Sequence, residues 1–139
     1  MFRHRRPVRF AEVDAARIVY FARHLDYCHD ALEALFAPLP GGYAHLTMVR
    51  GVGVPSVRVE VDYLAPLRYG DVVLIDVTVE RLGTRSVTFR HALTREADGV
   101  RCANVRQVVV LCRLDDLASV DIPVDVRSLL APHVVSPGT

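Results

Sequence analysis

The sequence predicts an α+β domain in which one long helix covers the apolar face of an antiparallel sheet. Four strand-like segments follow one another through short turns. Parallel neighbours would need connections of a dozen or more residues, so these short turns predict antiparallel pairing. One long amphipathic stretch, residues 22–36, is available to cover the sheet. With 139 residues, the chain suits a single domain over residues 1–139.

The first part of the chain changes from a strand pattern to a helix pattern. The basic run at residues 3–6 is expected to be a solvated flank rather than a patch for an anionic surface. A short strand is expected around Val8 and Phe10, and a break follows over residues 12–17. From about Ala22 the apolar residues recur at helical spacing. The expected buried side of this helix carries Leu25, Cys28, Leu32, Leu35 and Phe36.

The remainder reads mainly as strands. Two prolines and two glycines in residues 37–43 end the helix and predict a loop. Strands are expected over residues 52–64, 73–80, 87–94 and 100–114, where apolar and polar residues largely alternate. Val57, Val59, Val61 and Tyr63 form the expected buried side of the first. Alternation fails over residues 108–111, which predicts burial on both faces or cover by another subunit. A short helix is expected over residues 124–130.

Composition points to a small-molecule partner. The chain has 17 basic and 16 acidic residues, a net charge of +1 and no Trp, so neither nucleic acid nor a base-stacking platform is expected. No apolar run of about 18 residues predicts a membrane span, and the N-terminus has no signal-peptide pattern. Three widely spaced cysteines, Cys28, Cys102 and Cys112, suit buried, reduced thiols in a cytoplasmic protein.

Two segments carry a family resemblance. The first is Asp14-Ala15-Ala16-Arg17-Ile18-Val19-Tyr20-Phe21, and the second is residues 57–71, with Tyr63-Leu64-Ala65-Pro66 and Gly70-Asp71. Together they resemble the 4-hydroxybenzoyl-CoA thioesterase family of hotdog-fold proteins. The resemblance covers nearly the whole chain and implies a curved antiparallel sheet wrapped around a central helix. It also implies a coenzyme A thioester as substrate, no metal or other cofactor, and active sites between subunits.

The expected chemistry centres on a carboxylate. The chain has no Gly-x-Ser-x-Gly elbow and no Cys with an obvious His partner. A carboxylate can attack a thioester or activate a water, and amides at a helix N-terminus can stabilise the resulting oxyanion. The resemblance assigns these roles to Asp14 and to the amide of Phe21. The alternative for Asp14 is a helix N-cap or a turn residue.

Substrate contacts are expected from residues beside this pair and from one turn. Arg17 replaces the Gly usual in relatives and could narrow the site, bind a phosphate or carboxylate, or pair with a surface acid. The resemblance places coenzyme A phosphates near Arg85 and Ser86, whereas a solvated Arg is the alternative. His24 and His29 are spaced unsuitably for a metal and are expected to be surface or packed residues.

These observations predict an acyl-CoA thioesterase that favours aryl-CoA substrates such as 4-hydroxybenzoyl- or benzoyl-CoA. Tyr20 and Phe21, with Phe89 and Tyr43, could form a flat-walled acyl pocket, or they could fill the core. The alternatives are a short- or medium-chain acyl-CoA thioesterase, or a hotdog protein that binds acyl thioesters without turnover. A dehydratase fits less well. A homodimer or homotetramer is expected, because one helix cannot cover the whole sheet.

Overall fold

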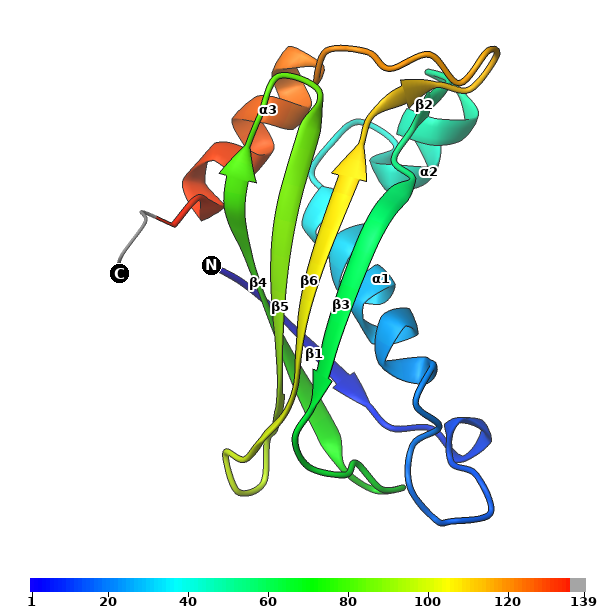
Figure 1. Cartoon of the computed structure of the whole chain (residues 1–139), viewed down its shortest axis with the longest axis vertical. Helices are drawn as coiled ribbons and strands as arrows, with labels where there is room; N and C mark the ends of the chain where they lie inside the picture. The colour runs from blue at the N-terminus through cyan, green and yellow to red at the C-terminus, as the bar shows by residue number, and fades with distance from the viewer. Residues whose placement is uncertain (136–139) are drawn as a thin grey trace.

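A five-stranded antiparallel sheet with helix α1 on one face forms the frame of the protein (Figure 1). The structure is a computed structural model and describes residues 1–135, so the last four residues of the expected domain lie outside the described part. The strand order is β1-β4-β5-β6-β3. The strands are β1 (Phe2–Pro7), β3 (Ser56–Tyr63), β4 (Val72–Leu82), β5 (Ser86–Arg95) and β6 (Arg101–Val110). A two-stranded sheet pairs β2 (Val52–Gly53) with β7 (Cys112–Arg113).

The expected sheet is confirmed as antiparallel, but its order is not a simple meander. Strand β3 pairs with β6 and not with β4, so the connection over residues 64–71 crosses one end of the sheet. That crossing leaves the other side of β4 open for β1. All six residues of β1 pair with the first half of β4. The crossing connection therefore forms a wall at one end of the sheet, next to the start of α1 (Figure 1).

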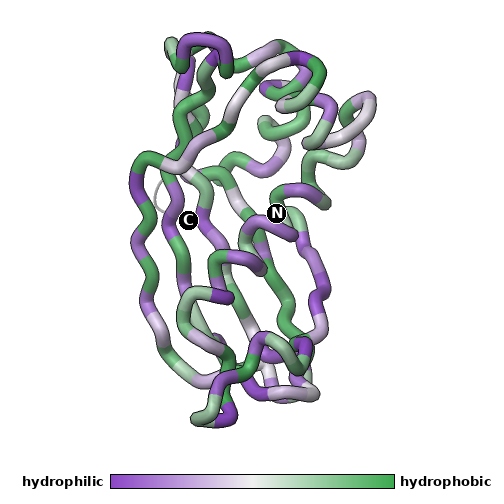
Figure 2. The backbone as a smooth tube through the Cα atoms, turned by 90° about the vertical axis from the view of Figure 1, so that its right-hand side faces the viewer, coloured by the Kyte–Doolittle hydropathy of each residue, from purple (hydrophilic) through white to green (hydrophobic). Residues whose placement is uncertain are grey.

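Helix α1 (Arg23–Phe36) buries its apolar side against the sheet, mainly over β1 and β4. Four β4 residues that face it, Val73, Ile75, Val77 and Val79, are fully buried. Figure 2 shows the alternation of hydrophobic and hydrophilic residues along these strands. Of the residues expected on the buried side of α1, Leu25 is instead exposed. It lies in the first helical turn, where α1 reaches beyond the core.

The basic N-terminal segment is a strand and not an unstructured flank, although the side chains of Arg3 and Arg5 are exposed to solvent as expected. Arg3 and Arg5 sit on β1 and form ion pairs with Asp76 and Glu96. Arg6 points to the other side and is buried. The strand expected around Val8 and Phe10 was also misplaced, because a short 3-10 helix, η1 (Phe10–Glu12), follows β1 directly. Alternating arginines thus serve as paired residues on an edge strand.

Strand β3 is an edge strand that is exposed on both faces. Val57, Val59 and Tyr63 were expected to be buried, but Val57 is 61% exposed and the other two are also exposed. The reason is the position of α1, which packs over β1 and β4 at the opposite side of the sheet. The side of the sheet nearest β3 is therefore open between the strand and the start of the helix.

The rest of the chain closes the far end of the sheet. Helix α2 (Gly42–Met48) begins at the end of the loop expected over residues 37–43 and ends before the strand expected from residue 52. Helix α3 (Val124–Leu130) lies where a helix was expected. A 3-10 turn, η2 (Ala131–His133), follows. In the doubly apolar segment, Val109 and Leu111 are buried, whereas Val108 and Val110 are half-buried. All three cysteines are free and buried, as expected.

The face of the sheet away from α1 is covered by ion pairs. Glu80 accepts hydrogen bonds from Arg90 and from Arg106, and Arg106 also lies within 3.9 Å of Glu60. This face therefore offers mainly charged groups to solvent. Within residues 1–135 no helix is both long and apolar enough to cross a bilayer.

On the inner face of the sheet, a short polar chain runs across β5, β6 and β3. The side-chain amide of Gln107 donates to Ser56 Oγ at 2.8 Å, so its carbonyl oxygen faces His91 Nε2, also at 2.8 Å. His91 Nε2 must therefore carry the proton. His91 Nδ1 is buried with no hydrogen-bond partner among the described residues. Burial lowers the pKa of His91 to about 4, although the Gln107 contact opposes this shift.

The lowered pKa of His91 predicts acid sensitivity between about pH 6.5 and 4. In that window the unfolded chain binds a proton that the folded chain excludes, so the free energy of unfolding falls as the pH falls. The contribution is complete above the ordinary pKa and is lost toward about pH 4. From pH 7 to pH 5 we expect a loss of about 2 kcal/mol from this residue. Urea unfolding at both pH values measures it.

The variant His91→Gln removes the titrating group and should show a smaller loss of stability over the same interval. His29→Gln changes an exposed histidine on α1 and is the matched control. An unchanged pH dependence in a folded His91→Gln protein would contradict the assignment.

Candidate active site

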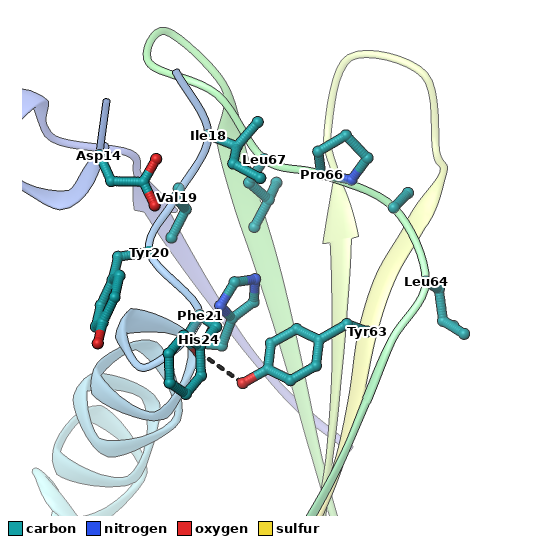
Figure 3. A pocket seen from close by; sticks show the side chains of 11 residues that line it. Asp14, Ile18, Val19, Tyr20, Phe21, His24, Tyr63, Leu64, Pro66 and Leu67 are labelled. Carbon is teal, nitrogen blue, oxygen red and sulfur yellow. Dashed lines mark hydrogen bonds between the residues drawn. The ribbon is translucent and has the colours of Figure 1, made fainter. Parts of the chain in front are cut away.

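A pocket of about 540 Å³ opens between the start of α1 and the connection that crosses from β3 to β4 (Figure 3). Its walls come from three segments: the loop before α1, the first turn of α1, and the chain from the end of β3 onward. Most of the lining is apolar or aromatic, and none of it is Lys or Arg. The lining residues are Asp14, Ile18, Val19, Tyr20, Phe21, His24, Tyr63, Leu64, Ala65, Pro66 and Leu67.

Asp14 stands at the first corner of a tight turn. Its amide donates to the Ile18 carbonyl at 3.0 Å, and its carbonyl accepts from the Arg17 amide at 2.9 Å. Its carboxylate Oδ1 accepts from the Ala16 amide at 2.8 Å, which is typical of Asp in turns. The second carboxylate oxygen has no partner among residues 1–135 and borders the pocket (Figure 3). Asp14 is thus a turn residue with one oxygen left for chemistry.

Arg17 occupies the last corner of this turn in a left-handed conformation, with φ of 65°. A type I turn followed by a left-handed residue is a common hairpin connection, and that position favours Gly. This explains why a Gly is usual there in the family that the sequence resembles. A side chain in this conformation costs about 1 kcal/mol. The guanidinium of Arg17 forms no ion pair with any described residue.

Phe21 presents its backbone to the pocket in a defined orientation. Helix α1 has no side-chain cap, and the Phe21 amide donates to no acceptor within residues 1–135. The Phe21 carbonyl, in contrast, accepts from the Tyr63 hydroxyl at 2.6 Å. Figure 3 shows this contact between the helix start and β3. The segment is held through its carbonyl while its amide stays free, as an oxyanion donor requires.

His24 was expected to be a surface or packed residue, and it is packed, with 4% exposure. Its Nδ1 lies 3.1 Å from the Phe21 carbonyl oxygen. A carbonyl only accepts, so Nδ1 must carry a proton. Burial lowers the pKa of His24, although backbone contacts to Phe21 and Tyr20 oppose this, and the ring is therefore neutral near pH 7. The other ring nitrogen, Nε2, is then an acceptor. The His24 ring packs edge-on against the Tyr63 ring, with 4.9 Å between the two ring centroids.

A buried ion pair positions the loop that carries Asp14. Arg6 on β1 forms two hydrogen bonds with the Glu12 carboxylate, at 2.5 and 2.9 Å. Glu12 also accepts from the Arg9 amide and from the hydroxyl of Tyr27 on α1. Burial is the largest single influence and would raise the pKa of Glu12, but the hydrogen bonds from Arg6, Arg9 and Tyr27 and the charge of Arg6 together outweigh it, so the pKa is lowered. The carboxylate is therefore charged and joins β1, η1 and α1.

The same network reaches the second catalytic candidate. The Glu12 carbonyl accepts from the Tyr20 amide at 3.0 Å, next to Phe21. Arg6 also donates to Asp30 on α1 at 2.9 Å. Both sides of the pocket mouth thus depend on the segment around Glu12.

The structure brings some predicted site residues together and separates others. Asp14, Tyr20 and Phe21 line the same pocket. Arg85 and Ser86 lie at the other end of β4, roughly 30 Å away along the strand (Figure 1). Arg85 donates to Asp121 at 2.9 Å and to Ser119 at 3.2 Å. Within one chain, these two residues cannot reach a substrate bound at Asp14.

Of the four aromatic residues predicted to line the acyl pocket, two do so. Tyr20 and Phe21 line it, but Phe89 is fully buried in the core. Tyr43 packs against α1 away from the pocket. Its ring centroid lies 5.4 Å from that of Phe36 and 5.5 Å from that of His29. Periodicity places an aromatic residue on a face but does not place it along the length of an element. The ring of Tyr63 takes the place that these two residues were expected to fill.

Sequence reasoning missed the roles of Tyr63, His24 and the Arg6–Glu12 pair. Tyr63 belongs to the second motif segment, and its position directly before the crossing connection could have indicated a site residue. Glu12 lies two residues before Asp14, but its partner Arg6 was assigned to a solvated terminus. His24 gave no signal, because a histidine in the first turn of a helix is compatible with many environments.

Comparison with known proteins shows that the chain is similar to thioesterases. The sequence profile of the thioesterase-like superfamily matches residues 8–130. A 1,4-dihydroxy-2-naphthoyl-CoA hydrolase from Thermosynechococcus vestitus is 32% identical over 120 residues, covering 86% of this chain and 82% of the relative. Its counterpart from Synechococcus elongatus is 34% identical over 112 residues, covering 80% of each chain.

A solved structure agrees with these relatives. The crystal structure of a thioesterase superfamily protein from Jannaschia sp. superposes with a TM-score of 0.87 and 31% sequence identity. The match covers 97% of this chain and 94% of that one. The profile match over residues 8–130 includes the turn of Asp14 and the crossing connection that together enclose the pocket.

Proposed function

This chain belongs to the thioesterase-like superfamily and is a thioester hydrolase of the hotdog fold, and we propose that it cleaves aryl-CoA thioesters with Asp14 as nucleophile or general base. The observation that carries this proposal is the pairing of two free groups at one pocket. One is the unpartnered carboxylate oxygen of Asp14, and the other is the unpartnered amide of Phe21.

The reaction converts an acyl-CoA and water into a carboxylic acid and free coenzyme A. In one route, Asp14 attacks the thioester carbon, the carbon–sulfur bond breaks, and water hydrolyses the resulting anhydride. In the other route, Asp14 removes a proton from the attacking water. In both routes the carbonyl oxygen becomes negative. The Phe21 amide then donates to this oxygen at the positive end of the α1 dipole.

Tyr63 and His24 act as positioning residues for Phe21. Both lie against its carbonyl, which fixes the first residues of the helix and keeps the free amide aimed out of it. Preorganised donors lose little free energy to reorientation when charge develops. Because His24 is neutral, it adds no positive charge to the pocket that Asp14 also lines.

We predict that Asp14→Asn folds normally and loses at least about 10²-fold in kcat, because the amide keeps the shape but is neither nucleophile nor base. The measurement is thiol release from benzoyl-CoA by native and variant protein. Asp26→Asn is the matched control, since Asp26 lies in the first turn of α1 and pairs only with Arg23 at the surface. Near-native turnover by a folded Asp14→Asn protein would contradict the mechanism.

The aryl preference rests on the rings around the pocket. The ring centroids of Tyr20 and Phe21 lie 4.8 Å apart. The rings of Tyr63 and His24 form a second pair that lines the same pocket. The curated relatives are named for a bicyclic aryl-CoA substrate. A benzoyl or 4-hydroxybenzoyl group presents the flat apolar surface that such rings pack against. The alternative is a short- or medium-chain acyl group, which the same volume would admit.

We predict that kcat/KM for benzoyl-CoA exceeds that for hexanoyl-CoA by roughly two- to ten-fold for each ring contact. Offset or edge-on ring contacts give about 0.5–1.5 kcal/mol beyond simple burial. Both substrates should be measured under one set of conditions. A clear preference for hexanoyl-CoA would contradict the aryl assignment and would leave the thioesterase assignment intact.

We also propose that the protein is at least a homodimer, assembled through β3. The strand is an open edge with exposed Val57, Val59 and Tyr63. Phe21, just before α1, and Leu25, in its first turn, are also exposed. A second copy would pair with this edge and cover these side chains. Because Tyr63 belongs to the pocket, the interface would border the active site. A tetramer stays a prediction, since the opposite face of the sheet is charged.

Light scattering at micromolar concentration should give at least twice the mass of one chain. Val59→Lys places a charge on the β3 edge and should shift the protein toward monomers. Val124→Lys makes the same change at an exposed site on α3 and is the matched control. A native protein that is monomeric and fully active would refute the assembly.

A further inference from the structure

A second hollow of about 470 Å³ lies on the other side of Asp14. We call it the arginine hollow. Among residues 1–135, Asp14 alone lines both this hollow and the 540 Å³ pocket described above, which we call the aromatic pocket. A group that attacks a thioester must lie beside the carbonyl carbon, which joins the acyl part to the sulfur part, so two hollows that meet at Asp14 suit the two halves of one ligand. The arginine hollow is lined by Phe10, Val13, Asp14, Ala15, Arg17, Arg68 and Tyr69.

Two unpaired cations line the arginine hollow. Arg17 and Arg68 are exposed, and neither side chain forms an ion pair or hydrogen bond with any residue in the described part of the chain. In contrast, Arg85 at the far end of the sheet already pairs with Asp121. Guanidinium groups bind phosphate oxygens well through their fixed pairs of donors. No Lys or Arg lines the aromatic pocket, so the two hollows differ in charge.

The conformation of Arg17 gives a second reason to look for a ligand. Its φ of 65° is one that Gly adopts without strain, and no contact within residues 1–135 compensates an arginine there. Strained residues of this kind cluster at binding and active sites. Replacing Gly by Arg at this corner puts a cation beside the catalytic carboxylate.

Two exposed aromatic rings complete the arginine hollow. Phe10 is 78% exposed and Tyr69 is 65% exposed, and their rings pack edge-on at 5.8 Å. They come from η1 and from the crossing connection, so the hollow joins the two segments that also build the active site. Exposed rings beside unpaired arginines match a ligand that has both a flat base and phosphates.

We propose that the arginine hollow binds the adenosine phosphate end of coenzyme A, with Arg17 and Arg68 at the phosphates and Phe10 and Tyr69 against the adenine. This inference rests on the proposed thioesterase function and assigns the orientation of the substrate. The acyl group enters the aromatic pocket, the thioester carbon lies at Asp14, and the pantetheine arm leads toward the arginines. The phosphate contact then comes from the same chain as Asp14 and not from Arg85 of a second copy.

The test compares two thioesters that share one acyl group. Benzoyl-CoA carries the nucleotide, and the N-acetylcysteamine thioester of benzoic acid lacks it. In the double variant Arg17→Gln/Arg68→Gln we expect KM for benzoyl-CoA to rise about ten-fold with little change in kcat, because two charge-assisted contacts are lost. We expect kcat/KM for the truncated thioester to change less than two-fold. Free coenzyme A should bind the double variant about ten-fold more weakly in calorimetry.

Two single variants serve as controls. Arg81→Gln removes an exposed arginine at the other end of β4 and should leave KM for benzoyl-CoA unchanged. Arg85→Gln tests the rival phosphate site, and a rise in KM in this variant alone would overturn the proposal. An unchanged KM and an unchanged coenzyme A affinity in the double variant would also overturn it. If the native protein cleaves neither thioester, the proposed function fails, while the calorimetry still decides the site.

Discussion

The buried ion pair between Arg6 and Glu12 is the interaction on which the proposed active site depends. It joins strand β1 to the 3-10 turn before Asp14, and Tyr27 and Asp30 extend it to α1. Two charges withdrawn from water must satisfy each other, and removal of one partner from such a pair costs about 3–5 kcal/mol. The Arg6–Glu12 pair therefore resists any shift of the loop relative to the helix, and the spacing between Asp14 and Phe21 follows from it.

The chemistry in turn depends on a helix end that is left without a cap. The first amides of a helix have no acceptor within the helix, and no side-chain cap supplies one at the start of α1. Tyr63 and His24 hold the neighbouring carbonyl instead, so the Phe21 amide keeps its orientation while remaining free. Tyr63 comes from the open edge of the sheet. The proposed assembly through that edge would thus act on the same residue that orients the proposed oxyanion donor.

Much of the fold could be predicted because periodicity reports local burial. The alternation in β4 and the helical spacing in α1 correspond directly to the buried faces. Predictions failed where the neighbour of a strand decides its environment. Residues 2–7 read as a polar terminus because the acids that pair with Arg3 and Arg5, Asp76 and Glu96, lie far away in the sequence. Strand β3 read as half-buried because its sequence alternates, although α1 lies over the other side of the sheet.

The sequence by itself determined the antiparallel α+β architecture and the limits of the long helix, since these follow from local spacing. The candidate pair of Asp14 and Phe21 came from the family resemblance of a motif within eight residues. Only the tertiary structure decided which distant residues meet that pair. Tyr63 reaches it because β3 pairs with β6 and its exit crosses the sheet end, whereas Arg85 is removed from it by the length of β4. Strand order is a long-range property, because it depends on which edges remain unpaired, and no local pattern encodes it.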